Sequence, residues 1–185
     1  HIPTRISVGN NGAKLVVGTT NGSLIWTTDG STWTTSQPTV EGWITASNIN
    51  MVSWMNDRYI ISDSASYIWT SPDLVSFTLM GAPFKQTSLQ VAPQMFNGFY
   101  DGTTYYLFGS DLKYQYGAVF TSTDAVTWTE QPYVSYLVAQ SSRYLNGKYF
   151  RIGNEGMQVC SDGKSWAFQW GGTFSDIVYD GSKYI

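Results

Sequence analysis

Charged side chains are scarce in this sequence, and this scarcity limits the partners that the chain can bind. Only 12% of the 185 residues are charged, and the formal net charge is −3 without any basic cluster. We therefore expect no nucleic-acid partner and no attraction to an anionic membrane surface. The sequence also has no apolar run long enough for a membrane span, so membrane insertion is not expected.

Histidine and cysteine occur once each, as His1 and Cys160. A single cysteine cannot form an intrachain disulfide, so it does not indicate a redox compartment. A nucleophile–histidine pair in a folded core is excluded by the same count. Metal sites made of histidine and cysteine are excluded too, and no loop has the alternating acids of a calcium site. We expect neither a metal nor a cofactor.

Strand-forming and turn-forming residues are abundant instead. Aromatic residues make up 16% of the chain, and threonine, serine and valine, which favour pleated and half-buried surfaces, are frequent. Asn-Gly and Asp-Gly pairs recur between apolar stretches and are typical of tight hairpin turns. The sequence therefore predicts an all-β fold.

One ten-residue stretch, WTTDGSTWTT at 26–35, recurs in weaker form at 69–78, 120–129 and 159–168. Each copy has an aspartate, an aromatic residue four positions later and a small residue two positions earlier. We expect the aspartate to cap a hairpin turn through backbone N–H groups, and the aromatic residue to pack beneath the hairpin or against its neighbour. These structural pairs are Asp29 and Trp33, Asp73 and Phe77, Asp124 and Trp128, and Asp162 and Trp166.

A second signal precedes each copy. A turn pair leads into an apolar strand at 10–18, 55–63, 100–109 and 145–153, and again at 179–185. Each unit then has four short antiparallel strands, which is typical of a β-propeller blade. We predict one propeller segment over 1–185, part of a larger propeller, with four and a half blades at about 5–38, 48–81, 91–132, 136–170 and, incomplete, 175–185.

The recurring aspartate stretch resembles the Asp-box of bacterial neuraminidase repeats. The first copy, Thr27 to Trp33, fits closely, whereas the second and third lack the glycine and the fourth has Cys160 in place of the hydroxyl residue. The resemblance implies a β-propeller whose boxes are structural and lie at the blade periphery. It does not imply one function, because Asp-boxes occur in sialidases, other glycosidases, sorting receptors, photosystem assembly factors and virion proteins.

Three acids are weak candidates for catalysis. Asp63, Asp111 and Glu155 each follow the second strand of successive blades, at the end of a propeller where ligands usually bind. We name this end, with the second-to-third-strand loops and the links between blades, the loop face. A glycosidase needs two carboxyl groups about 5 Å or about 6.5–9.5 Å apart. The simpler interpretation is that these acids are solvated, and a sialidase-like arginine triad is not expected from only four arginines.

Aromatic and amide residues of the loop face are the better-supported candidates, for ligand binding. Such side chains stack on sugars or anchor protein interfaces, although filling gaps between blades is the simpler interpretation for Trp43 and Phe84. The candidate ligand-binding residues are Trp43, Phe84, Lys113, Tyr114, Tyr116 and Tyr133.

Three functions remain open on these observations. The favoured one is a noncatalytic adhesion or structural propeller in an extracellular or virion assembly, because low charge and degenerate repeats are in the style of bacteriophage tail and virion proteins. Its partners would be other subunits, or a cell-surface glycan or protein receptor. The alternatives are a glycoside hydrolase of the sialidase-like type and a protein-binding assembly factor.

Overall fold

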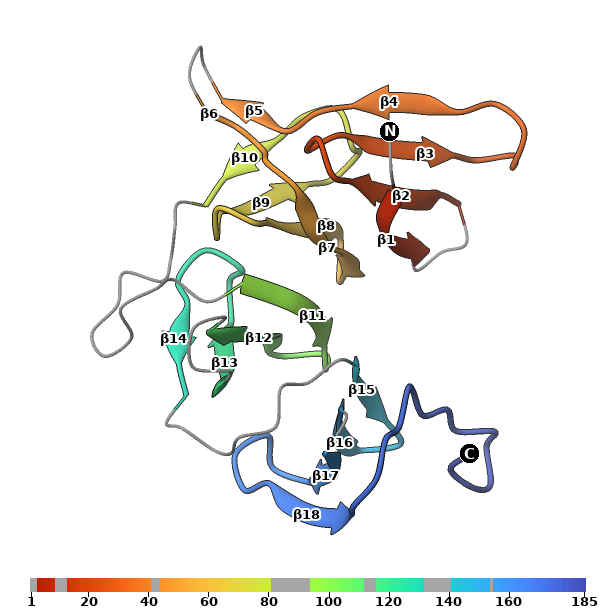
Figure 1. Ribbon diagram of the computed structural model, residues 1–185, viewed down its shortest axis with the longest axis vertical. Coiled ribbons are helices and arrows are strands. Elements are labelled where there is room, and N and C mark those ends of the chain that lie inside the picture. Colours follow the sequence, from red (N-terminus) through yellow and green to blue (C-terminus); the bar gives the residue numbers. More distant parts are fainter. Residues whose placement is uncertain are drawn as a thin grey trace. The chain divides into compact units, whose positions relative to one another are not determined.

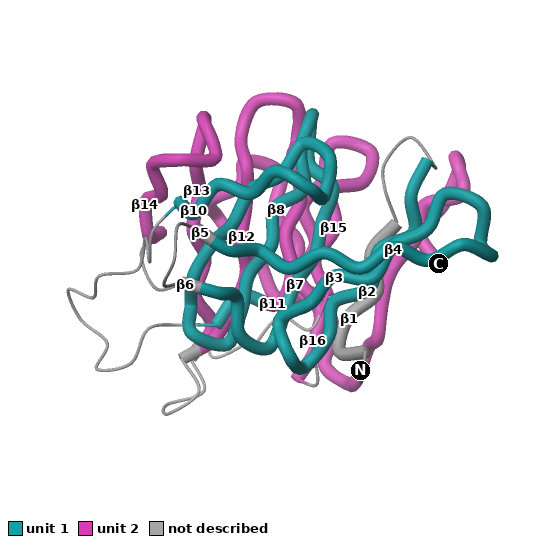
Figure 2. The backbone as a smooth tube through the Cα atoms, turned by 90° about the horizontal axis from the view of Figure 1, so that it is seen from above, with its two compact units in different colours: residues 1–95 teal, residues 96–185 magenta. Residues whose placement is uncertain are grey.

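The computed structural model describes residues 3–8, 13–40, 44–80, 94–111, 116–131, 141–153 and 155–185 (Figure 1). These residues form strands and turns, with no helix among them and hence none that could cross a membrane. Four antiparallel sheets of four strands follow one another along the chain. The predicted all-β fold of four-stranded blades is confirmed. The chain divides into two compact units, residues 1–95 and 96–185 (Figure 2), and each unit is described by itself.

The first unit contains two of the four-stranded sheets. Sheet 1 has the order β1 (Pro3–Val8), β2 (Leu15–Thr19), β3 (Leu24–Thr27) and β4 (Thr34–Ser36). Sheet 2 consists of β7 (Ile49–Met55), β8 (Arg58–Asp63), β9 (Ile68–Ser71) and β10 (Thr78–Leu79). Between them lies a two-stranded hairpin that was not predicted, β5 (Thr39–Val40) with β6 (Ile44–Thr45).

The other two sheets follow in the same order. Sheet 3 consists of β11 (Gln94–Tyr100), β12 (Tyr105–Asp111), β13 (Tyr116–Ser122) and β14 (Thr129–Glu130). Sheet 4 consists of β15 (Ser141–Leu145), β16 (Lys148–Gly153), β17 (Gly156–Cys160) and β18 (Ala167–Trp170). That residues 1–185 make one propeller segment stays a prediction.

The core of the first unit lies between sheets 1 and 2. Val16 and Leu24 of sheet 1 pack in one buried cluster with Ile61 and Trp69 of sheet 2. Because side chains alternate along a strand, the residues next to these four on the same strands point to the opposite face of their sheet. Gly18 brings the sheets close together, since a Cβ atom there would lie 2.5 Å from Cγ2 of Ile49.

The second strand of sheet 4, β16, packs against other residues on both of its faces. Tyr149 packs with Phe108 and Val119 of sheet 3. On the opposite face, Phe150 packs with Ile177, which lies in the segment after β18. Successive residues of this strand thus pack on opposite faces of the sheet.

The segment after β18 ends in a short hairpin. Tyr179 and Tyr184 form an isolated antiparallel bridge, and Val178 and Ile185 exchange backbone hydrogen bonds of 3.1 and 2.9 Å. The hairpin corresponds to the first two strands of the predicted fifth blade, although it is reduced to this bridge.

Candidate functional site

The four recurring aspartates lie in the hairpins between the third and fourth strands, which we name the Asp hairpins. In the first, Oδ1 of Asp29 accepts the backbone N–H groups of Ser31 at 2.8 Å and Thr32 at 2.7 Å. The Thr27 hydroxyl donates to Asp29 at 3.0 Å and accepts the N–H of Gly30 at 2.9 Å. The carboxylates of Asp73, Asp124 and Asp162 accept corresponding bonds.

These hydrogen bonds keep the aspartates ionised. Those from the backbone N–H groups of Thr32 and Ser31 hold the pKa of Asp29 well below its usual range. At Asp124 the N–H of Thr127 contributes most, and the pKa falls to about 2. A general acid needs a raised pKa near the working pH, so these carboxylates suit turn capping and not proton donation.

The residue after each aspartate has a left-handed backbone. Gly30 and Gly163 have φ angles of +77° and +73°, and Leu74 and Ala125 have +69° and +61°. Glycine adopts this conformation without strain, whereas other residues lose roughly 1–2 kcal/mol. The second and third hairpins therefore keep the turn geometry although they lack the glycine.

The aromatic residues of the Asp hairpins differ in burial. Trp33 is 45% exposed, Trp128 is half-buried, and Phe77 packs against the core of the first unit. Trp166 packs edge-on against Phe108 with ring centroids 6.0 Å apart. Two of the four thus pack against a core as expected, and Trp33 is the most exposed.

The guanidinium of Arg151 is buried between sheets 3 and 4. Arg151 is 1% exposed, and its Cζ lies 5.1 Å from the ring centroid of Trp166 and 5.9 Å from that of Phe108. Burial lowers the pKa of Arg151 to about 10, so the side chain is still charged at neutral pH. Cation–π contacts of a desolvated cation are worth up to about 2 kcal/mol, and this one joins the two sheets.

A second recurring structure was not recognised in the sequence. In the hairpins between first and second strands, which we name the inner hairpins, two aromatic residues five positions apart face each other across the turn. Their ring centroids are 4.5–4.9 Å apart. A Trp or Tyr on each side of a turn pair is the signal that reveals it, since cross-strand aromatic pairs stabilise hairpins. The pairs are Trp54 and Tyr59, Tyr100 and Tyr105, Tyr144 and Tyr149, and Tyr179 and Tyr184.

Two inner hairpins also have a capping aspartate. Asp101 accepts the N–H groups of Thr103 and Thr104, both at 2.8 Å, and Asp180 accepts those of Ser182 and Lys183, also at 2.8 Å. The Tyr149 hydroxyl donates to Asp101 at 2.7 Å. Burial, followed by this bond to Asp101, raises the pKa of Tyr149, so the phenol stays protonated and joins sheet 4 to sheet 3.

Asp63, a candidate catalytic acid, is fully buried. Oδ1 accepts the N–H groups of Ala65 and Tyr67, both at 3.0 Å, and Oδ2 accepts the N–H of Ser47 at 3.1 Å. The interpretation as a solvated acid is therefore wrong for Asp63. Its carboxylate fixes the loop after β8 to the link that precedes β7, and it has no exposed surface for a substrate.

The structure describes less of the other two candidate acids, Glu155 and Asp111. Glu155 is exposed in the turn between β16 and β17. Asp111 ends β12 opposite Tyr116 of β13, and the side chains of this pair lie outside the described residues. The expected approach of Asp63, Asp111 and Glu155 to one another stays a prediction. Within the described ranges, no group of three or more His, Cys, Asp or Glu residues is placed to hold a metal ion.

Most of the predicted ligand-binding residues fall outside the described residues. Only Tyr116 lies within a described strand, at the start of β13, and its side chain is not described. Binding at the loop face therefore stays a prediction. The residues outside the described ranges are Trp43, Phe84, Lys113, Tyr114 and Tyr133.

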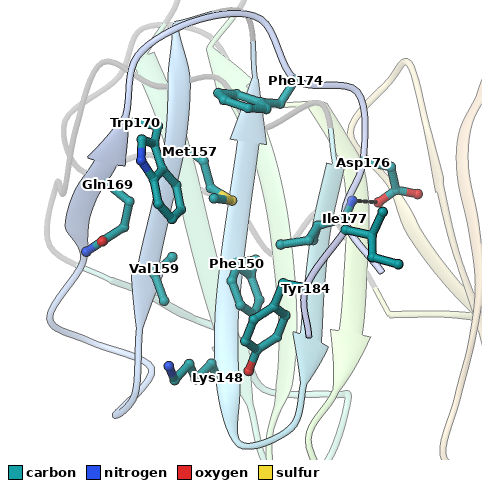
Figure 3. Close-up of a pocket in the computed structure, with 11 residues that line it drawn as sticks. Lys148, Phe150, Met157, Val159, Gln169, Trp170, Phe174, Asp176, Ile177 and Tyr184 are labelled. Carbon is teal, nitrogen blue, oxygen red and sulfur yellow. Dashed lines mark hydrogen bonds between the residues drawn. The ribbon is translucent and has the colours of Figure 1, made fainter. Parts of the chain in front are cut away.

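A cavity of about 370 Å³ lies between sheet 4 and the segment after β18 (Figure 3). Phe150, Met157 and Val159 of β16 and β17 form its floor, and Trp170 of β18 stands at one side. On the other side are side chains of the segment after β18, namely Phe174, Ile177, Tyr184 and Ile185. The volume lies within the range of about 300–1,000 Å³ that is common for ligand sites.

Two charged side chains line this cavity, those of Asp176 and Lys148. Asp176 is paired with Arg143 at 2.6 Å and accepts the Ser141 hydroxyl at 2.9 Å. Lys148 lies with its Nζ 5.7 Å from the Tyr184 ring centroid. The carboxylate is thus neutralised by an arginine, and the lysine is the cationic group of the lining. An apolar cavity with few polar groups is suited to binding and not to acid–base chemistry.

Comparison with known proteins identifies the fold and no family. No family model and no curated protein matches the sequence. The nidogen/laminin complex contains a chain with a TM-score of 0.69 and 11% identity, matched over 97% of this chain and 69% of that chain. YCF48 bound to D1 peptide has a TM-score of 0.60 and 15% identity, matched over 89% of this chain and 52% of that chain. The Cps50 (Swd1) β-propeller domain of Myceliophteria thermophila has a TM-score of 0.54 and 8% identity, matched over 85% of this chain and 53% of that chain.

The class of protein follows from the sheets and these comparisons together. Four consecutive four-stranded antiparallel sheets and structural similarity to β-propellers show that the chain has the β-propeller fold. At such low identity the similarity identifies the fold alone. The chain spans about two thirds of the nidogen chain and about half of the other two.

Proposed function

We propose that this chain is a noncatalytic binding propeller that engages a protein partner in an extracellular or virion assembly. The observation that carries the proposal is how the aspartates are used. Asp29, Asp73, Asp124 and Asp162 each cap a turn through backbone N–H groups. Capping of this kind stabilises a scaffold and contributes nothing to catalysis.

The most buried of the candidate acids supports the same proposal. Glycoside hydrolysis requires one carboxyl group that donates a proton and a second that acts as nucleophile or base, both in contact with the sugar. Asp63 has no exposed surface and already accepts three backbone N–H groups. Asp176 is held by Arg143. These carboxylates are suited to holding the fold.

A protein partner is favoured by two of the structural neighbours. One belongs to a complex with laminin and one is bound to a peptide, which makes protein recognition the simplest use of a related fold. We place the contact at the loop face, because its sequence combines aromatic and amide side chains, as protein-binding surfaces do. An assembly factor would use the same surface, whereas a glycan receptor would engage its aromatic residues by stacking.

The test compares two tyrosines of the loop face with an exposed apolar residue elsewhere on the chain. The full chain is applied to arrays of extracellular protein domains and of glycans, together with a Tyr114→Ala/Tyr116→Ala variant and a Val75→Ala variant. Val75 is 67% exposed at the tip of an Asp hairpin, so it controls for loss of exposed apolar area. We expect protein binding that the tyrosine variant loses and the valine variant keeps. Glycoside cleavage that disappears in Glu155→Gln or Asp111→Asn would overturn the proposal.

A further inference from the structure

Asn97 and Gly98 lie in β11, the first strand of sheet 3, and the side chain of Asn97 contacts the backbone of Gly98. The Gly98 N–H donates to Oδ1 of Asn97 at 2.7 Å. Because Cγ is bonded to that oxygen at about 1.2 Å, the Gly98 nitrogen lies no further than about 4 Å from Cγ. This is near the separation of about 3–3.5 Å at which two atoms are positioned to react.

Two further properties of this pair favour a reaction between the nitrogen and Cγ. Asn97 and Gly98 are both half-buried, so water and hydroxide ion reach them. Glycine has no Cβ atom that would hinder the close approach of its backbone. Asparagine is a thermolabile residue, because the backbone nitrogen that follows it can attack its amide carbon.

The Asn-Gly pair at Asn21 and Gly22 is held differently. The Gly22 N–H donates to the backbone oxygen of Thr19 at 3.3 Å, and Oδ1 of Asn21 accepts the N–H of Ser23, also at 3.3 Å. The nitrogen is thus directed to Thr19 and the side chain to Ser23. This pair serves as a protected reference.

The Asn-Gly pair at Asn146 and Gly147 differs in exposure. Both residues are exposed in the inner hairpin between β15 and β16, with left-handed φ angles of +50° and +73°. Among the described residues, no hydrogen bond joins the Asn146 side chain to the Gly147 nitrogen. This pair therefore shows what exposure does without the contact. The remaining Asn-Gly pair, at 11–12, lies outside the described residues.

We propose that Asn97 is a site of spontaneous covalent modification, at which the Gly98 nitrogen attacks Cγ of the Asn97 side chain. The nitrogen gives its proton to hydroxide ion and bonds to Cγ, the Cγ–Nδ2 bond breaks, and Nδ2 leaves as ammonia with a proton from water. Water then opens the five-membered imide. Cleavage between the nitrogen and the Asn97 backbone carbonyl carbon gives isoaspartate, whereas cleavage between the nitrogen and Cγ gives aspartate. The proposal goes beyond the proposed function, because the reaction needs no binding partner.

Isoaspartate at this position lengthens the backbone of β11 by one carbon atom. Phe99, the next residue after Gly98, packs against Phe108 of sheet 3 and Tyr149 of sheet 4, with ring centroids 5.5 and 5.9 Å apart. Side chains alternate along a strand with a fixed period, so the additional atom displaces Phe99 from these contacts. The modification therefore loosens the packing of sheet 3 against sheet 4.

The experiment measures how folding changes the reactivity of each asparagine. The whole chain is kept at mildly alkaline pH, both folded and unfolded in urea, and its proteolytic peptides are followed by mass spectrometry. Fragmentation of the peptides separates isoaspartate from aspartate. We expect Asn97 to convert at least as fast in the folded chain as in the unfolded chain, because the contact exists only in the folded chain. Asn21 should convert about tenfold more slowly or less when folded.

The ratio of folded to unfolded rates decides the proposal, because it removes differences in local sequence. A ratio at Asn97 as low as that at Asn21 would overturn the proposal. A ratio at Asn97 no higher than that at Asn146 would also overturn it, since exposure would then explain the reaction without the contact.

Two variants test the attacking and the attacked group separately. Gly98→Ala places a methyl group beside the nitrogen, and Asn97→Gln moves the amide carbon one bond away, so that a six-membered ring would have to form. Each should slow conversion at position 97 in the folded chain by about tenfold or more and leave Asn146 unchanged. Undiminished conversion in Asn97→Gln would contradict attack by the Gly98 nitrogen.

The variant Asn97→Asp separates the effect of charge from that of the longer backbone. It carries the new carboxylate without the additional carbon atom. Chain that has converted to isoaspartate should therefore unfold at a lower urea concentration than freshly prepared Asn97→Asp. Unfolding of both at the same concentration would overturn the inferred loosening of sheets 3 and 4.

Discussion

The four Asp hairpins reach one geometry from different residues. The first and fourth have glycine at the left-handed position, whereas the second and third have Leu74 and Ala125. The first three use a hydroxyl to bond the aspartate, and the fourth uses the Cys160 thiol at 3.0 Å. The carboxylate with its two backbone N–H bonds is common to all four. The four hairpins thus show that the carboxylate with its two N–H bonds fixes the turn, whereas the residues around it can differ.

Substituting the two glycines should give the largest difference between hairpins. A Cβ atom at Gly163 would lie 2.5 Å from the Tyr106 hydroxyl, whereas at Gly30 nothing lies within 4 Å. We expect Gly163→Ala to lower the free energy of unfolding by about 3 kcal/mol, from backbone strain and displacement of Tyr106. Gly30→Ala should cost only the strain, about 1 kcal/mol. Urea denaturation measures both, and equal losses would show that Tyr106 moves freely.

Removing the hydroxyl of one hairpin should have the next largest effect. The Ser122 hydroxyl accepts the N–H groups of Asp124 and Ala125 at 3.2 and 2.9 Å and donates to the carboxylate at 2.8 Å. Ser122→Ala leaves these N–H groups without their acceptor, which should cost about 2 kcal/mol of unfolding free energy. Thermal and urea unfolding measure it. Thr123→Ala, at an exposed neighbouring position, is the control and should be neutral.

Restoring the hydroxyl to the fourth hairpin should give a smaller effect of opposite sign. A hydroxyl is a stronger donor and acceptor than a thiol, so Cys160→Ser should raise the free energy of unfolding by about 0.5–1 kcal/mol. Burial of the Cys160 side chain opposes this gain. A loss of stability in urea denaturation would mean that the buried sulfur contributes through packing.

The smallest effect for any one hairpin should be its pH dependence. The pKa of Asp124 is lowered in the folded protein to about 2 by the N–H groups of Thr127 and Val126, whereas an unfolded aspartate has a pKa of about 3.9. Its contribution is therefore fully present above about pH 4 and is lost as the pH falls through the folded value. Urea unfolding at a series of acidic pH values should show a shallower decline for Asp124→Asn. An identical decline would exclude a contribution from this carboxylate.

Local spacing made the fold predictable, and long-range contacts limited prediction of the site. The aspartate, its hydroxyl partner and the turn lie within a few residues, so the repeat predicted the four-stranded sheets that are observed. Asp63 was misread as solvated because one of its donors, Ser47, lies 16 residues away. The cavity depends on contacts between sheet 4 and Ile177 or Tyr184, which no local pattern reveals.

The short range of the Asp-hairpin bonds has a consequence for how the chain folds. Each carboxylate accepts backbone N–H groups only two or three positions away, so closing the turn costs little loop entropy. Hairpins of this kind form in about 1–10 μs, before distant segments meet. The aspartates would then act as independent nuclei spaced along the polypeptide, which commit each blade to its own strand register before neighbouring blades of similar sequence can exchange strands.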